Sequence, residues 1–260
     1  MNANAAAVLG RPMWFELMTP ELDAAVAFYT EVVGWTSAPF GGSPEPYVMF
    51  NRAGGIPAAG ALKTPAHVNA PPFWSMYIGV PDLEAASAKV TELGGARHTD
   101  VIDVPGIGRM QLMADPQGAV FYLYQPASDE HAPEGPAEVG EASWLELMTT
   151  DARAAMRFYQ DLFGWQPSDA LDMGELGTYQ MFNRPHGMIG GMMNRSEEMA
   201  QVPPNWQIYF RVPEITGAVE RIKSNEGQIF NGPMEVPGGD WVVNAMDPQG
   251  AAFSLHAKAK

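Results

Sequence analysis

An internal repeat constrains the fold of this chain more than any other feature. The segment WFELMTPELDAAVAFYTEVVGW at residues 14–35 returns as WLELMTTDARAAMRFYQDLFGW at residues 144–165, and half of the aligned positions are identical. The first six residues of each copy alternate between two faces, which predicts a β-strand. Apolar residues at helical spacing follow, among them Ala25, Phe28 and Val32, and they predict a helix that packs on a sheet. Each copy should therefore form a strand, a helix and a second strand.

The ends of the two predicted helices carry recognisable signals. Thr19 and Thr149, with the acidic residues after them, are expected to form the helix N-termini, because hydroxyl and carboxylate oxygens accept hydrogen bonds from free backbone N–H groups. Gly34 and Gly164 are expected to end the helices, since glycine readily adopts the left-handed conformation of a helix stop.

The repeat extends over nearly the whole chain. Trp74 matches Trp206, and the turn sequence Asp-Pro-Gln-Gly at Asp115 returns at Asp247 in the same alignment. Strand and helix signals within each copy predict two modules, each with one strand, one helix and three further strands. Asp115 and Asp247 are expected to be structural, because Asp is favoured in tight turns for its bonds to nearby backbone.

The domain organisation follows from the repeat and from chain length. A chain of 260 residues is long enough for two domains of about 120 residues each. Between the copies lies a segment rich in Pro, Ala and Glu, which is typical of a linker. We predict an N-terminal domain at residues 1–130, a linker at 131–142 and a C-terminal domain at 143–260.

Composition excludes several classes of function. The chain has 30 acidic and 15 basic residues and a net charge of −15, which disfavours nucleic acids and anionic membranes as partners. It has no cysteine, so thiolate nucleophiles and zinc-thiolate sites are excluded. The start of the chain lacks the cationic and apolar pattern of a signal peptide, and a long apolar stretch is missing. We therefore expect a cytoplasmic protein.

Paired modules, a helix ending in Phe-Tyr-x-x-x-x-Gly-Trp, and a late Asp-Pro-Gln-Gly before an apolar strand together resemble the vicinal oxygen chelate superfamily. This is the group of glyoxalases, bleomycin-resistance proteins and extradiol dioxygenases. In detail the chain is most similar to two-domain glyoxalase-like proteins of actinobacteria. The resemblance implies an α+β fold of tandem domains, in which each pair of βαβββ modules curls into a half-open barrel around a pocket.

Many members of that superfamily hold a divalent metal in the pocket, with ligands on the first and last strand of each module. In this sequence the corresponding positions hold Trp14, Ser75, Tyr122, Trp144, Gln207 and Ser254, with the remaining ones near Ala61 and Met193. A stable site needs three or four converging N, O or S ligands, and only Gln207 is even a weak candidate. We therefore expect neither a metal nor another cofactor.

Strand alternation assigns side chains to the face opposite the helices, which is the pocket wall in the resembling fold. The predicted ligand-binding residues on that face are Trp14, Tyr77, Tyr122, Trp144, Gln207, Tyr209, Arg211, Ser254 and His256. The aromatic members suggest a clamp for a flat ligand, although packing of a small barrel would also need large side chains.

Glu16 and Glu146 are the candidate catalytic residues, because a carboxylate on an inward face must be paired, hydrated or protonated. Desolvation would raise the carboxyl pKa and suit a general base for proton abstraction. Alternatively, each glutamate accepts hydrogen bonds from a neighbouring Tyr, Trp or backbone group, and Arg211 is a possible partner of Glu146. Ser254 and His256 share a strand face, but a nucleophile and base pair is disfavoured because no orienting acid is evident.

Three functional hypotheses remain. The first is a protein that binds a small, flat or aromatic organic molecule in metal-free pockets. The second is a glyoxalase-type lyase or isomerase that uses a pocket glutamate as general base. The third is a metal-dependent lyase or dioxygenase with relocated ligands. The duplication places two related domains in one chain, so we predict a monomer with an internal pseudo-dimer.

Overall fold

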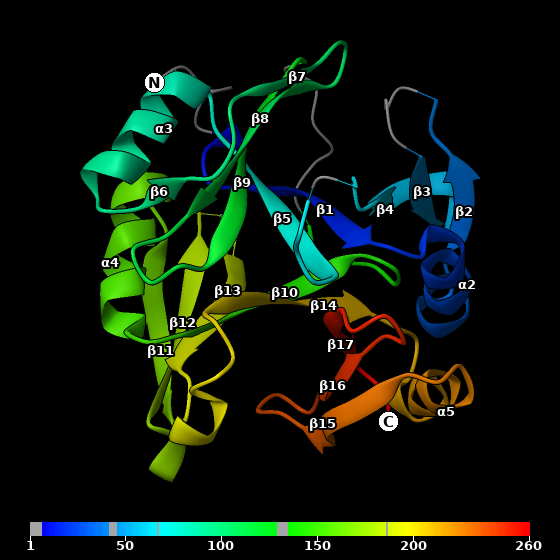
Figure 1. The fold of residues 1–260 in the computed structure, drawn as a ribbon. Helices are drawn as coiled ribbons and strands as arrows, with labels where there is room; N and C mark the ends of the chain where they lie inside the picture. The colour runs from blue at the N-terminus through cyan, green and yellow to red at the C-terminus, as the bar shows by residue number, and fades with distance from the viewer. Residues whose placement is uncertain (1–6, 42–45, 67, 129–134, 186) are drawn as a thin grey trace. The chain divides into compact units, whose positions relative to one another are not determined.

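Two open β-sheets, one in each copy of the repeat, organise the chain (Figure 1). The computed structural model describes residues 7–41, 46–66, 68–128, 135–185 and 187–260. The first sheet has the strand order β2-β3-β4-β1-β5-β9-β8-β6, with β7 paired to β8, and the second has the order β11-β12-β13-β10-β14-β17-β16-β15. The predicted α+β class with two modules in each half is confirmed.

The strands of the first sheet are β1 (Pro12–Thr19), β2 (Thr36–Pro39), β3 (Tyr47–Arg52), β4 (Ile56–Lys63), β5 (Phe73–Gly79), β6 (Ala96–Arg97), β7 (Ile102–Val104), β8 (Gly108–Ala114) and β9 (Val120–Pro126). Those of the second are β10 (Ala142–Thr149), β11 (Gln166–Asp172), β12 (Thr178–Arg184), β13 (Gly187–Asn194), β14 (Asn205–Arg211), β15 (Gln228–Glu235), β16 (Trp241–Met246) and β17 (Ala252–Ala257). The α-helices are α2 (Leu22–Val33), α3 (Leu83–Glu92), α4 (Ala152–Phe163) and α5 (Ile215–Ser224), and short 3-10 helices occur at η1 (Ala53–Gly55), η2 (Gly174–Leu176) and η3 (Glu197–Met199).

The helix stops are confirmed, and of the predicted helix starts the acidic residues Glu21 and Asp151 are confirmed whereas the threonines are wrong. Gly34 ends α2 with φ 85° and Gly164 ends α4 with φ 74°. Thr19 and Thr149 do not begin the helices, because each is the fully buried last residue of a strand. The helix α4 begins after Asp151, whose carboxylate accepts a hydrogen bond from the backbone N–H of Ala154 at 2.9 Å. Each threonine is paired with a residue of the neighbouring strand, Thr19 with Lys63 and Thr149 with Asn194. The helix therefore begins at a later residue.

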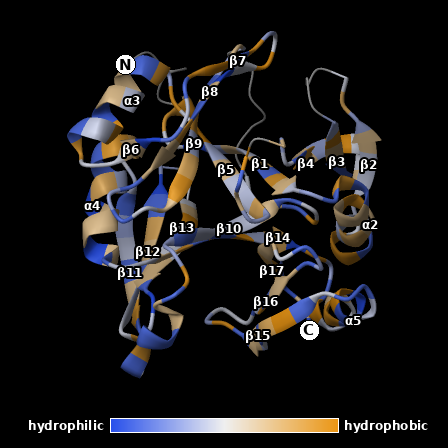
Figure 2. Ribbon diagram, in the orientation of Figure 1, coloured by the Kyte–Doolittle hydropathy of each residue, from blue (hydrophilic) through white to orange (hydrophobic). Residues whose placement is uncertain are grey.

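The helices are amphipathic, with hydrophilic and hydrophobic residues on different faces (Figure 2). In α4 the buried face includes Met156, Phe158, Tyr159 and Phe163. Over the part of the chain that the structure describes, none of the helices is long and apolar enough to cross a membrane.

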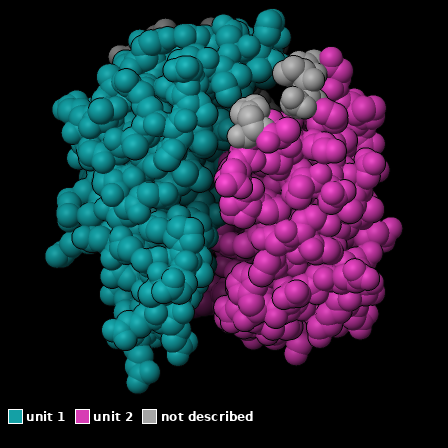
Figure 3. Space-filling model, viewed as in Figure 1, with its two compact units in different colours: residues 1–13, 76–135, 145–206 teal, residues 14–75, 136–144, 207–260 magenta. Residues whose placement is uncertain are grey.

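The chain forms two compact units, and each unit takes segments from both halves of the sequence (Figure 3). Unit 1 comprises residues 1–13, 76–135 and 145–206, and unit 2 comprises residues 14–75, 136–144 and 207–260. The helices α3 and α4 contact each other in unit 1, and α2 and α5 do so in unit 2. The sequential domains at 1–130 and 143–260 remain a prediction, and residues 131–134 of the predicted linker lie outside the described residues.

Each unit is joined internally by a buried tyrosine and aspartate. In unit 2 the hydroxyl of Tyr29 on α2 donates to Asp247 at 3.1 Å and accepts from the indole N–H of Trp74 at 2.9 Å. In unit 1 Tyr159 donates to Asp115 at 3.0 Å in the matching arrangement. The Phe-Tyr helix of one half therefore bonds to the Asp-Pro-Gln-Gly turn of the other half.

A second reciprocal contact involves the glycine just before each half's first strand. The indole N–H of Trp165 donates to the carbonyl of Gly10 at 2.8 Å, and that of Trp35 donates to the carbonyl of Gly140 at 2.8 Å. Both glycines have positive φ, and a Cβ at Gly10 would lie 2.9 Å from Phe163. Glycine is therefore required where the chain enters these strands.

Candidate ligand-binding site

Glu16 is held by a tyrosine that reaches it from two strands away. On the parallel strands β1 and β4, Glu16 lies opposite Gly60. The side chain of Tyr47, from β3, packs directly over this glycine. A Cβ on Gly60 would lie 2.0 Å from the Tyr47 hydroxyl, so only glycine leaves room for it. Tyr47 hydrogen-bonds to Glu16 and accepts from the indole N–H of Trp14 at 2.9 Å. Burial first, and then the negative charge of Glu16, raise the pKa of Tyr47 far above its usual value, so its hydroxyl stays protonated.

The same arrangement recurs in the second half. Glu146 on β10 lies opposite Gly191 on β13, and Tyr179 donates its hydroxyl to Glu146 Oε2 at 3.0 Å. A Cβ on Gly191 would lie 2.1 Å from the Tyr179 ring. Each glutamate thus accepts a phenol hydrogen bond, which was one of the two expected interpretations, and a general-base role stays a prediction. Sequence reasoning missed Tyr47 and Tyr179, although both occupy the same position of the repeat.

Four buried polar residues in unit 2 form a connected group that we call the polar wall: Gln207, Tyr209, Asn244 and Ser254. The strand register places Tyr209 opposite Ser254 and Ser254 opposite Asn244. Gln207 Nε2 donates to Ser254 Oγ at 2.9 Å, and Asn244 Nδ2 lies 2.7 Å from Ser254 Oγ and 2.9 Å from the Tyr209 hydroxyl. The sequence predicted three of these residues, and the structure brings them together through Asn244, which was missed.

Two residues of the polar wall, Gln207 and Ser254, occupy positions where the resemblance places metal ligands, so the chemistry of the wall can be compared with that of a divalent metal site. Gln207 and Ser254 offer a neutral amide and a neutral hydroxyl, and these two groups bond to each other. Within the described ranges, no three His, Cys, Asp or Glu residues are close enough to hold a metal ion together. The donor set of the polar wall does not fit a divalent cation, because it lacks the charged or imidazole ligands that such sites use.

His256 and Arg211 lie at the next inward positions along the same strands and have other partners. His256 Nδ1 lies 2.8 Å from the hydroxyl of Ser143, and its Nε2 lies 2.7 Å from Asp240. The expectation that no acid orients His256 was therefore wrong, but the hydroxyl beside the imidazole belongs to Ser143 and not to Ser254. Ser143 Oγ also lies 3.2 Å from the Tyr209 carbonyl. Arg211 Nη1 donates to the carbonyl of Ala137 at 2.7 Å.

The aromatic residues predicted as a clamp are only partly available for a ligand. Tyr77 and Tyr122 in unit 1 stack on each other with ring centroids 4.3 Å apart and an angle of 5°. A flat ligand cannot enter between these two rings, because the gap already equals one stacking distance. Trp14 and Trp144 lie half-buried on β1 and β10.

These features define a class of protein: a duplicated α+β chain whose open sheets carry polar and aromatic side chains on the face opposite the helices. The chain belongs to the glyoxalase/bleomycin resistance protein/dioxygenase superfamily, whose family model matches residues 142–255. A model described as a glyoxalase-like domain matches residues 14–124.

Two similar proteins cover almost the whole chain. CFP32 of Mycobacterium tuberculosis, provisionally named a glyoxylase, is 31% identical over 249 residues, which are 95% of this chain and 94% of that protein. The anthracycline biosynthesis protein DauV of Streptomyces sp. strain C5 is 31% identical over 262 residues, with 95% and 92% coverage. The predicted resemblance to actinobacterial glyoxalase-like proteins is confirmed.

Solved structures support the fold at low sequence identity. The Mn(II)-bound glyoxalase of Novosphingobium aromaticivorans has a TM-score of 0.65 at 16% identity, covering 97% of this chain and 83% of that chain. A variant of homoprotocatechuate 2,3-dioxygenase from B. fuscum has a TM-score of 0.68 at 17% identity, covering 97% and 72%.

Proposed function

We propose that the chain binds a small organic molecule at the polar wall, and that this molecule is flat and carries carbonyl or hydroxyl groups. The observation that carries this proposal is the bond between Gln207 and Ser254 at positions where the superfamily's metal ligands are expected. An amide, a phenol and a hydroxyl offer both donors and acceptors, which suits the oxygen groups of an organic ligand.

Access to the polar wall is supported by the gradient of exposure along its strands. Ser254 is fully buried and Gln207 is 7% exposed, whereas two positions further along, the His256 side chain is 17% exposed and its partner Asp240 is 33% exposed. Polar side chains therefore continue from the buried wall toward solvent. A ligand could enter along this track, exchanging bonds with water for bonds with the wall.

The names of two relatives suggest the ligand's chemical class. DauV and DnrV are both named for anthracycline biosynthesis, and each is 31% identical to this chain. Anthracyclines are flat fused-ring compounds with carbonyl and hydroxyl groups, which matches the class that the polar wall suits.

The proposal is tested by titrating the protein with 1,4-dihydroxyanthraquinone and following tryptophan fluorescence. We expect saturable binding, and we expect Tyr209→Phe to weaken it about tenfold, because one hydrogen bond is lost while the ring is kept. Tyr124→Phe is the matched control, since its hydroxyl bonds to the Ile107 carbonyl in unit 1. Equal affinities for the two variants, or no saturable binding, would contradict the proposal.

A second candidate is a lyase or isomerase in which Glu16 or Glu146 acts as general base, and the repeated glutamate and tyrosine pair favours it. The phenol of Tyr179 fixes the Glu146 carboxylate in one orientation, as a base in an active site requires. For any turned-over substrate, Glu146→Gln should abolish turnover and retain binding. Unchanged turnover in that variant would end this hypothesis.

The remaining expectations are proposals with direct tests. A metal-dependent lyase or dioxygenase with relocated ligands is tested by elemental analysis of the purified protein, and stoichiometric metal would favour it. The functional form is proposed to be a monomer without a cofactor. A mass near 28.2 kDa by light scattering would support the monomer, and twice that mass would refute it.

A further inference from the structure

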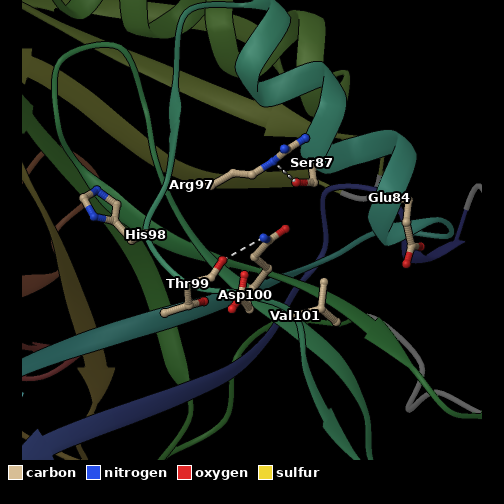
Figure 4. A pocket seen from close by; sticks show the side chains of 8 residues that line it. Glu84, Ser87, Arg97, His98, Thr99, Asp100 and Val101 are labelled. Atoms are coloured by element: carbon tan, nitrogen blue, oxygen red, sulfur yellow. Dashed lines mark hydrogen bonds between the residues drawn. The ribbon is translucent and has the colours of Figure 1, made fainter. Parts of the chain in front are cut away.

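A second candidate site lies in unit 1, where a hollow of about 610 Å³ opens beside α3 (Figure 4). Its wall comes from α3, β6, β8 and the loop at residues 98–101. Arg97 crosses toward the helix and donates its Nε–H to the hydroxyl of Ser87 at 2.8 Å. Asp100 lies below Arg97 in the view of Figure 4, and His98 turns away from both. The volume falls within the range of about 300–1,000 Å³ that is usual for ligand pockets.

The repeat provides an internal comparison for this hollow. The alignment that matches Asp115 with Asp247 also gives the corresponding positions of the fourth module. The strand pairing agrees with it, because Arg97 pairs with Met113 as Ile229 pairs with Ala245. Three polar residues that line the hollow from its helix and strands have apolar counterparts: Ser87 and Val219, Arg97 and Ile229, and Gln111 and Val243. The fourth module therefore shows that this fold can pack apolar side chains at all three positions.

Gln111 is the most informative of the three. This residue is 5% exposed, and its side chain donates Nε2–H to the Thr99 carbonyl at 2.8 Å. Its Oε1 atom is buried and has no hydrogen-bond partner among the described residues. An unsatisfied buried acceptor lowers stability, and the valine in the fourth module avoids this loss. A ligand that donates a hydrogen bond to Oε1 would explain why an amide stands here.

We propose that the hollow binds a free amino acid with an apolar side chain such as that of leucine. Asp100 and Gln111 Oε1 would receive the ammonium group, and the remaining guanidinium N–H groups of Arg97 would bind the carboxylate. The hollow's other carboxylate, Glu84, is already paired with Arg109. Val101 lines the hollow and is 38% exposed, so it offers apolar surface for the side chain of the ligand. This site is independent of the polar wall.

The test uses three matched probes on the full chain, followed by ligand-observed NMR and calorimetry. L-Leucine carries both charged groups, 3-methylbutylamine lacks the carboxylate, and 4-methylpentanoate lacks the amine. We expect saturable binding of leucine that is at least about tenfold tighter than binding of either probe, because each probe loses one charged contact. Equal binding of leucine and one of the probes would overturn the proposal, as would no saturable binding of leucine.

Variants locate the site. Arg97→Ile installs the residue of the fourth module and should weaken leucine binding at least about tenfold. Arg157→Ile removes the same charge from an exposed position on α4 and should leave binding unchanged. Gln111→Val should also weaken binding while the melting temperature does not fall, since Val243 is accommodated at the matching position. Unchanged leucine binding in Arg97→Ile and Gln111→Val would place the site elsewhere and refute the assignment.

Discussion

Replacing Tyr29 by phenylalanine should destabilise the protein substantially, because two buried groups lose their partner. The Tyr29 hydroxyl donates to Asp247 and accepts from the Trp74 indole, and the side chain is fully buried. A hydrogen bond to a charged group contributes about 1.5–3 kcal/mol, and a buried N–H left without an acceptor costs about 1–3 kcal/mol. Because these two effects overlap, we expect the free energy of unfolding to fall by about 3 kcal/mol. For a chain of this size this corresponds to a fall of about 6–12 °C in melting temperature.

The loss should depend on pH through Asp247. Burial raises the pKa of Asp247 above its ordinary value, while backbone N–H groups and the Tyr29 hydroxyl lower it by a smaller amount. The folded state therefore binds this proton more tightly than the unfolded chain, so this group makes stability fall as pH rises from about 4 through the folded pKa. Tyr29→Phe removes a donor to the carboxylate and raises that pKa further. The loss of unfolding free energy caused by Tyr29→Phe should therefore be larger at pH 8 than at pH 4.

Urea unfolding of dilute protein at both pH values measures the effect. Dilution is needed because the sequence pI is about 4.6, where net repulsion between molecules is small. Tyr124→Phe is the control: its hydroxyl donates to the Ile107 carbonyl at an exposed position, and its loss should cost about 1 kcal/mol or less. Equal destabilisation by the two variants, or a Tyr29→Phe cost that does not change with pH, would refute the reasoning.

Two further predictions concern positions where the repeat makes close contacts. Gly191→Ala should lower the free energy of unfolding by about 1–3 kcal/mol, because the new Cβ would lie 2.1 Å from the Tyr179 ring and displace it. The control is Gly135→Ala, whose Cβ would have nothing within 4 Å. This variant should melt at nearly the same temperature as the unchanged protein. Trp35→Phe should cost about 1–3 kcal/mol, since the buried Gly140 carbonyl loses its donor, and an unchanged denaturation midpoint would contradict this.

The sequence predicted the modules well, because the repeat compares each signal with an independent copy. The left-handed stops at Gly34 and Gly164 followed from glycine alone. The structural role of Asp115 and Asp247 in their turns was also predicted, and both accept backbone N–H groups at 2.9 Å. These features depend on local backbone geometry, which neighbouring residues determine.

The partners of the site residues could not be predicted, because they lie on strands whose register the sequence does not fix. Strand alternation placed Glu16 on the inward face, but its tyrosine comes from β3 across Gly60. Asn244 connects Tyr209 and Ser254 from β16. The available signal for the first arrangement was a tyrosine that recurs at the matching position of both copies, Tyr47 and Tyr179.

The exchange of segments between the two units has a consequence for the order of events on the ribosome. When synthesis has reached the end of the first half, Tyr29 has not yet met its aspartate, because Asp247 is still to be translated. Asp115 likewise awaits the Tyr159 hydroxyl. Neither compact unit can be completed until the second half emerges, so the nascent first half must remain unaggregated in the meantime. The net negative charge of the chain would help by keeping neighbouring nascent chains apart.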